Sequence, residues 1–167
     1  MISDTLGVEP VFINSALVSA QNRQRFYWAN WKIEQPRDKG ILLNEIIDRD
    51  CDNVNSDGWH KWWMVNFEFQ LRKKYSSICN NGSINKAICM TARQFSSWNG
   101  NFILMKESKG LYYSPKLRNL TPIECERLQT VPDNYTNHVS NTQRYKMLGN
   151  GWTVDVIAHI FHQGQLL

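Results

Sequence analysis

The apolar residues near the start of the chain fall into two short runs separated by a polar stretch. The first run covers residues 11–18, the second covers residues 26–31, and Gln21-Asn22-Arg23-Gln24-Arg25 lies between them. Runs of this length that are rich in apolar, aromatic and β-branched residues favour strands. Because two strands cannot form a stable sheet alone, the pattern predicts the edge of a larger sheet.

The residues after position 118 carry the start and stop signals of a short helix. Thr121 can cap the helix N-terminus, Pro122 suits the first helical position, and Glu124 completes a capping box. The dipeptide Val131-Pro132 should end this helix, because the residue before a proline is pushed out of the α region.

Two further helices are predicted beyond it. Ser140 and Gln143 have the spacing of a second capping box, and Gly149 is a natural left-handed stop. The third helix follows this stop. Its apolar residues gather on one side, with Trp152, Val156 and Ile160 on one face and Val154, Ile157 and Phe161 beside them.

The middle of the chain is divided by charge. Residues 33–58 hold seven acids and three bases, whereas residues 60–98 hold six bases and one acid. An acidic block followed by a basic one fits a protein with one side that faces DNA. The alternative is a solvated charged face, and for Arg72-Lys73-Lys74 alone that alternative is preferred. One short helix is predicted near residues 41–49, with Leu43, Ile46 and Ile47 on its apolar side.

Composition excludes several classes of protein. The 167 residues are 42% hydrophobic with a net charge of +4, which fits one domain, or a small domain plus part of another. Cys51, Cys79, Cys89 and Cys125 form no Cys-x-x-Cys pair and have no metal-ligand spacing with the histidines, so we expect reduced thiols and no metal. With no signal peptide and no apolar run of membrane length, we expect a cytoplasmic protein.

The order of residues from 118 onward resembles the two closing conserved blocks of cytosine-C5 DNA methyltransferases. The ninth block is matched by Arg118-x-Leu120-Thr121-x-x-Glu124-x-x-x-Leu128-Gln129-x-x-Pro132-x-x-Tyr135, and the tenth by Ser140-x-x-Gln143-x-Tyr145-Lys146-x-x-Gly149-Asn150. The resemblance implies that Gly149, Asn150 and Trp152 lie on the side of the cofactor S-adenosylmethionine. Trp152 can also be read as part of the core.

The polar stretch between the two N-terminal runs resembles the eighth block of the same family. Residues two apart in a strand share a face, so Gln21, Arg23 and Arg25 could aim at one ligand. The resemblance implies that this set lines the pocket for the flipped cytosine, with Arg23 and Arg25 as catalytic residues and Gln21 in contact with DNA.

The segments 86–93 and 99–103 resemble the target-recognition domain of these enzymes. The family run there is similar to Lys-Ala-x-Thr-Leu-Thr-Ala, and this chain departs from it at Cys89-Met90. The resemblance implies that Lys86, Thr91 and Arg93 contact double-stranded DNA beside the target base. The resemblance therefore predicts where the chain contacts DNA, and not which DNA sequence it recognises.

The resemblance covers the C-terminal half of the family pattern. The chain has no glycine-rich cofactor loop, no cysteine after a proline, and no Glu-Asn-Val-like block. We therefore expect an α/β fold, comprising an incomplete C-terminal part of a Rossmann-like methyltransferase domain and a small mixed target-recognition domain. The expected regions are 1–32 with sheet-edge strands, 33–117 with connector and recognition domain, and 118–167 with closing helices.

Two main functions remain open at this point. The first is part of a DNA (cytosine-5-)-methyltransferase of a bacterium or phage-infected cell, inactive alone and completed by an N-terminal half or subunit that shares S-adenosylmethionine. The second is a non-catalytic DNA-binding or regulatory remnant. An unrelated basic α+β adaptor is a third reading, and the ordered blocks argue against it.

Overall fold

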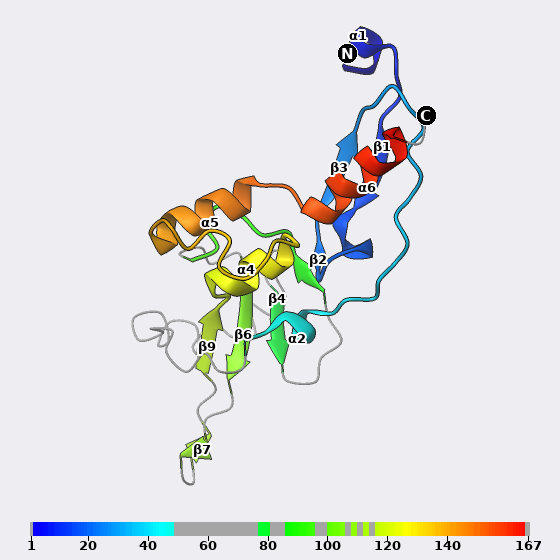
Figure 1. Cartoon of the computed structure of the whole chain (residues 1–167). Coiled ribbons are helices and arrows are strands. Elements are labelled where there is room, and N and C mark those ends of the chain that lie inside the picture. The colour runs from blue at the N-terminus through cyan, green and yellow to red at the C-terminus, as the bar shows by residue number, and fades with distance from the viewer. Residues whose placement is uncertain are drawn as a thin grey trace.

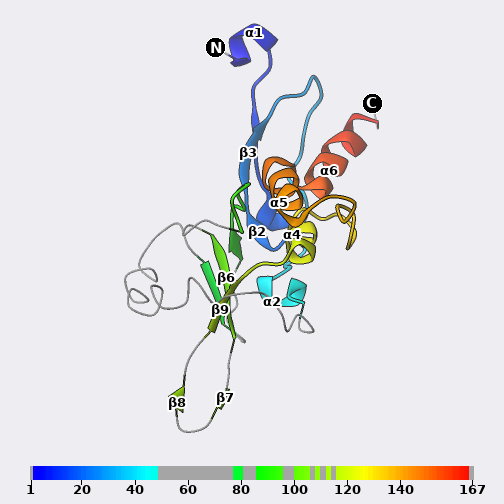
Figure 2. The same cartoon turned by 90° about the vertical axis from the view of Figure 1, so that its left-hand side faces the viewer.

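The structure, a computed structural model, describes residues 2–48, 77–80, 86–95, 100–105, 108–109, 112–113 and 116–165. Figure 1 shows an upper part that holds both termini and a lower part built on a sheet. Figures 1 and 2 place helices α4 (Pro122–Leu128) and α5 (Asn141–Asn150) where the two parts meet. Short α1 (Ile2–Leu6), which sequence patterns did not predict, lies at the upper end.

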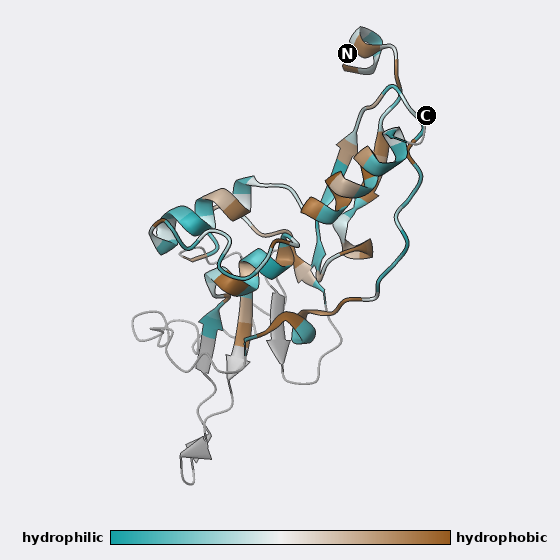
Figure 3. Cartoon of the chain, viewed as in Figure 1, coloured by the Kyte–Doolittle hydropathy of each residue, from teal (hydrophilic) through white to brown (hydrophobic). Residues whose placement is uncertain are grey.

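The upper part is a two-stranded antiparallel sheet covered by a helix. Strand β1 (Val11–Asn14) pairs with β3 (Gln24–Tyr27), with Ile13 opposite Arg25. Helix α6 (Val154–Gly164) packs on this sheet. Apolar and polar residues alternate around α6 in Figure 3, in keeping with one face on the sheet and one in solvent. The shared core contains Ile13, Val18, Ile33, Val156 and Ile160.

Both predicted N-terminal strands exist, with different bounds. The first ends at Asn14, because the Asn14 side chain accepts a hydrogen bond from the Ala16 N–H and starts the 3-10 turn η1 (Ser15–Leu17). The second begins at Gln24, inside the stretch predicted to be a polar turn. The two-residue strand β2 (Gln21–Asn22) precedes it.

The lower part is a three-stranded sheet in the order β4-β6-β9. Strand β6 (Asn101–Met105) runs parallel to β4 (Ser77–Asn80) and antiparallel to β9 (Lys116–Asn119). The strands β7 (Ser108–Lys109) and β8 (Tyr112–Tyr113) pair with each other. At the junction, β2 pairs in parallel with β5 (Ala87–Ile88), which joins the N-terminal strands to the lower part.

A second hydrophobic cluster fills the junction between the sheet and the helices. It draws on all three predicted regions of the chain, whose boundaries stay a prediction. Its buried members are Ala20, Leu43, Ile46, Ala87, Met90, Ile103, Leu120, Cys125, Leu128, Tyr145 and Leu148.

The helices follow the predicted signals in part. Thr121 caps α4 through its side chain and Glu124 returns a hydrogen bond to the Thr121 N–H, as a capping box requires. The second predicted box is wrong, because the Ser140 side chain makes no capping hydrogen bond. Gly149 is not a left-handed stop either: it lies inside α5, and Gly151 follows as an extended C-cap with φ −72°.

The remaining predicted helices begin or end at other residues than expected. Helix α2 covers Leu43–Ile46 alone, so Ile47 lies beyond its end. Trp152 precedes α6 and is 62% exposed, so it does not share a buried helix face with Val156 and Ile160. None of the helices in the described ranges is long and apolar enough to cross a membrane.

Candidate functional site

Gln21, the first residue of the predicted cytosine-pocket set, is fully buried in strand β2. Its Nε2 donates to the Leu128 carbonyl at 2.7 Å and to Gln129 Oε1 at 3.1 Å, and its Oε1 accepts from the Met90 N–H at 3.3 Å. The amide therefore joins three segments of the chain and has no exposed surface for a ligand.

Arg23 is 4% exposed and makes contacts of the same kind. Its Nη1 donates to the Met90 carbonyl at 3.1 Å and lies 3.3 Å from Cys89 Sγ. Its Nη2 donates to the carbonyls of Gly149 at 3.2 Å and Gly151 at 2.7 Å. Hydrogen bonds from an ionised donor are roughly twice as strong as neutral ones, so this guanidinium ties the 89–90 and 149–151 segments firmly together.

Arg25 is the member of the set that solvent can reach. It is exposed, its Nη1 donates to the Gln24 carbonyl at 2.7 Å, and its Nη2 lies 3.8 Å from Cys89 Sγ. The structure thus brings Arg23 and Arg25 together at Cys89, while burying the first and leaving the second accessible. Gln21, Arg23 and Arg25 do not form one ligand-facing row, since a break between β2 and β3 separates them.

The predicted DNA contacts divide into one partly buried side chain and two that solvent can reach. Lys86 Nζ donates to the carbonyls of Ala16 at 2.6 Å and Ser19 at 3.0 Å. Burial lowers the pKa of Lys86 below the ordinary 10.5, although Asp38 and Glu45 act in the opposite direction. Thr91 and Arg93 are exposed in the turn that follows β5. Within the basic block, Lys61, Arg72, Lys73 and Lys74 lie outside the described residues, as does Asn99 of the predicted recognition segment 99–103.

The predicted cofactor-side residues lie at the C-terminal end of α5 and in the turn that follows it. Asn150 and Trp152 are exposed, whereas Gly149 is buried. A Cβ atom at Gly149 would lie 2.2 Å from the Ala92 backbone nitrogen and 2.3 Å from the Thr91 carbonyl carbon. Glycine is therefore required there by backbone-to-backbone packing between α5 and the turn after β5.

Gln129 is a site residue that sequence reasoning did not select. It is 1% exposed, its Nε2 donates to the Leu148 carbonyl, and its Oε1 accepts from Thr153 Oγ1 at 3.1 Å and from Gln21. The Gln129 carbonyl also accepts from the Val154 N–H, so it fixes the start of α6. The Leu128-Gln129 pair of the ninth block was the available signal.

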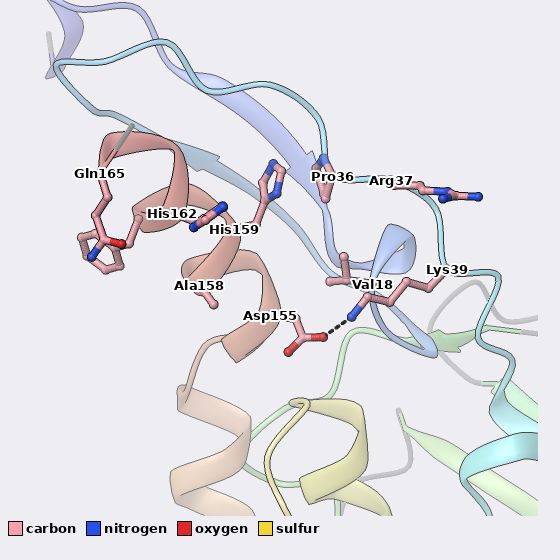
Figure 4. Close-up of a pocket in the computed structure, with 10 residues that line it drawn as sticks. Val18, Pro36, Arg37, Lys39, Asp155, Ala158, His159, His162 and Gln165 are labelled. Atoms are coloured by element: carbon pink, nitrogen blue, oxygen red, sulfur yellow. Dashed lines mark hydrogen bonds and ion pairs between the residues drawn. The ribbon is translucent and has the colours of Figure 1, made fainter. Parts of the chain in front are cut away.

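A groove of about 700 Å³ lies away from these residues, between the connector and α6 (Figure 4). An ion pair between Lys39 Nζ and Asp155 Oδ2 at 2.5 Å crosses one end of it. None of the predicted site residues lines this groove. Its lining residues are Val18, Pro36, Arg37, Lys39, Asp155, Ala158, His159, Phe161, His162 and Gln165.

Comparison with known proteins decides the family. The sequence model of C-5 cytosine-specific DNA methylases matches residues 24–165. The chain belongs to this family. Among its relatives, the orphan methyltransferase M.SPBetaI of Bacillus phage SPbeta is 41% identical over 59 residues, which are 32% of this chain and 13% of the relative. The type II methyltransferase M.Sau3AI of Staphylococcus aureus is 24% identical over 133 residues, which are 75% of this chain and 32% of the relative.

Solved structures agree on the fold of this methylase-family chain. The methyltransferase EhMeth of Entamoeba histolytica matches with a TM-score of 0.64 at 17% identity, covering 96% of this chain and 54% of that one. The Dnmt2 methyltransferase of S. pombe matches with a TM-score of 0.60 at 14% identity, covering 91% and 55%. The chain thus spans about half the length of these α/β methyltransferases. The predicted α/β fold and the predicted kinship with phage and bacterial methyltransferases are confirmed.

Proposed function

We propose that this chain is the C-terminal part of a DNA (cytosine-5-)-methyltransferase and supplies target recognition, a cytosine-pocket arginine and the cofactor-side turn, which comprises residues 149–152. The observation that carries the proposal is the position of Arg25. Its exposed guanidinium rests against Cys89, two residues before the exposed Thr91 of the predicted recognition segment 86–93. A cation beside a DNA-reading segment is suited to a base that has left the duplex.

The chemistry assigned to Arg25 is electrostatic. Nucleophilic addition at C6 of cytosine places negative charge on the ring and its carbonyl oxygen. A fixed cation next to that oxygen stabilises the charge as it develops, and a preorganised donor of this kind is worth about a hundredfold or more in rate. The nucleophilic cysteine belongs to the complementary part of the enzyme, since no cysteine of this chain follows a proline.

S-adenosylmethionine, which supplies an activated methyl group, fits the exposed end of α5 and the turn that follows it. Trp152 offers an indole surface that is 62% exposed, and Asn150 offers an exposed amide two residues earlier. An aromatic face together with a few polar groups is the usual lining of a pocket for a ligand with an adenine ring. Gly149 serves this turn by allowing close packing rather than by touching the cofactor.

The partner we propose is the nucleophile-bearing half of a methyltransferase, docked on the upper sheet. Within the described residues that sheet has two strands, and one edge of β3 has no strand beside it. Phe12 and Phe26 stack edge to face at 5.5 Å and are 44% and 58% exposed. An open edge flanked by exposed aromatic rings is a surface on which further strands can pair.

Transfer of labelled methyl groups from S-adenosylmethionine to duplex DNA tests the proposal. We expect no transfer by this chain alone, and transfer when it is mixed with the nucleophile-bearing half of a relative such as M.Sau3AI. That half alone is the control and should be inactive. Methylation by the isolated chain would overturn the division of roles, and the absence of transfer and of DNA binding in the mixture would overturn the function.

A further inference from the structure

We infer that Arg23 is a positioning residue that couples the DNA-recognition segment to the cofactor-side turn, an inference that rests on the proposed function. Arg23 has almost no exposed surface, so it has little to offer a bound base or phosphate. The four contacts that its guanidinium makes with described residues are instead shared between two segments far apart in the sequence. Two go to Cys89 and Met90, just before Thr91, and two go to Gly149 and Gly151, on either side of Asn150.

A second contact between the same segments is independent of Arg23. Helix α5 approaches the turn after β5 so closely at Gly149 that a Cβ atom there would lie 2.2 Å from the Ala92 nitrogen. Backbone therefore touches backbone, and no flexible side chain can absorb a shift of one segment against the other. A displacement of Thr91 on DNA binding must move Gly149, or break the bonds that Arg23 makes.

Arg25 depends on the same arrangement. Arg23 holds Cys89 from the buried side at 3.3 Å, and the Arg25 guanidinium rests on the same sulfur at 3.8 Å. The position of the exposed cation is therefore set in part by the buried one. A lysine at position 23 would keep the charge, but its single compact ammonium cannot reach carbonyls on both segments in the fixed geometry of a guanidinium.

Coupling between two ligand sites is reciprocal and typically changes each affinity by about fivefold or more. In the enzyme assembled from both halves, we expect duplex DNA to tighten the binding of S-adenosylhomocysteine by at least roughly that factor. In Arg23→Lys the enhancement should fall toward onefold, while each ligand still binds by itself. The matched control is Arg37→Lys, an exposed arginine of the connector, which should keep the enhancement.

If Arg23 had a purely structural role, Arg23→Lys would lower the stability of the fold. It would leave unchanged the ratio of the S-adenosylhomocysteine affinities measured with and without duplex DNA. The ratio is therefore the deciding quantity, and an unchanged ratio in a folded Arg23→Lys variant overturns the inference. So does independent binding of DNA and S-adenosylhomocysteine by the wild-type assembly, a measurement that needs no variant. If the assembly binds neither ligand, the proposed function fails, and the next measurement still decides the role of Arg23.

The rate of thiol labelling at Cys89 reports positioning without any enzyme activity. The isolated chain would carry Cys51→Ser and Cys79→Ser. Burial, with Glu124 and Glu126, raises the pKa of the Cys125 thiol well above its ordinary value, so Cys125 stays unreactive. We expect faster labelling of Cys89 in Arg23→Lys than in the wild type or in Arg37→Lys. Equal rates in all three would show that Arg23 does not hold this segment.

Discussion

Arg25 and Arg23 are two residues apart in the sequence, yet their surroundings assign them different work. Arg25→Ala should slow single-turnover methylation by about a hundredfold or more when DNA and S-adenosylmethionine are saturating, because a preorganised donor to the reacting ring is lost. General affinity for DNA should change little. The measurement is quenched-flow methylation by the assembled enzyme.

Arg37→Ala is the matched control for Arg25→Ala, since Arg37 is also an exposed arginine and lies beside the groove along α6. It should react at the wild-type rate. If Arg25→Ala also reacts at the wild-type rate and only its affinity for DNA falls, Arg25 is a phosphate contact, because such contacts weaken binding uniformly across sequences.

Glu126 is a fully buried carboxylate whose charge is balanced by several donors. Burial alone raises its pKa, but hydrogen bonds from Thr136, Arg144 and the Asn134 N–H outweigh this and hold the pKa below the ordinary 4.5. A carboxylate with a lowered folded-state pKa stabilises the fold above its unfolded pKa. That contribution is lost as the pH falls through the folded pKa.

Glu126→Gln should therefore lower the free energy of unfolding by about 3–5 kcal/mol at pH 7, because it leaves Arg144 buried without a charged partner. Below pH 4.5 the difference from the wild type should shrink, since protonated glutamate and glutamine are both neutral. Urea unfolding between pH 7 and pH 3 measures this. Glu9→Gln, at an exposed glutamate, is the control, and a pH-independent difference for Glu126→Gln would contradict the argument.

At the scale of elements, the sequence predicted those helix ends and strands that depend on contacts between residues close in the chain. The Thr121–Glu124 capping box formed within one turn of the chain, and the two N-terminal strands pair across a short intervening stretch, from Asn14 with Gln24 to Val11 with Tyr27. Gly149 was wrongly predicted to end a helix. The contact that requires a glycine there is with the Thr91–Ala92 backbone, more than fifty positions away in the chain. The burial of Gln21 and Arg23 was missed for the same cause: their acceptors, among them Leu128 and Gly151, come from distant segments.

Substitution of Gly149 by alanine has two opposing effects on stability, one from helix propensity and one from overlap with a distant segment. Inside a helix, alanine is more stable than glycine by about 1 kcal/mol. Here the added Cβ would overlap the Ala92 backbone at 2.2 Å, and forcing an atom into a packed site typically costs about 1–3 kcal/mol or more. We expect the overlap to prevail, so Gly149→Ala should lower the urea midpoint.

Thr142→Ala, on the exposed part of the same helix, is the control for Gly149→Ala and should leave the midpoint unchanged or slightly raised. A Gly149→Ala variant as stable as the wild type would show that α5 can move away from the turn after β5. In that case the coupling assigned to Arg23 would also lose its second support.

On the scale of the whole molecule, the two hydrophobic clusters differ in how well they are covered. The junction cluster consists of buried side chains, most of which come from α2, α4, α5, β5 and β6. The upper cluster is covered by α6 on one side, and large apolar side chains remain exposed around it. These are Phe12, Phe26, Trp152, Val154 and Phe161. Among these, the rings of Phe12 and Phe26 contact each other and form an exposed apolar patch, and such a patch marks an interaction face.

We therefore expect the isolated chain to self-associate at micromolar concentration and to bind a hydrophobic dye, because no described residue covers its open sheet edge and exposed aromatic rings. Phe26→Lys should reduce both, since a lysine beside a free strand edge opposes pairing between chains. Tyr135→Lys, at a side chain that is 63% exposed in the loop after α4, is the control and should reduce neither. Sedimentation velocity and dye fluorescence provide the measurements.

Addition of the nucleophile-bearing half should suppress both self-association and dye binding in the wild type. A wild-type chain that is monomeric and does not bind the dye would show that this face needs no partner.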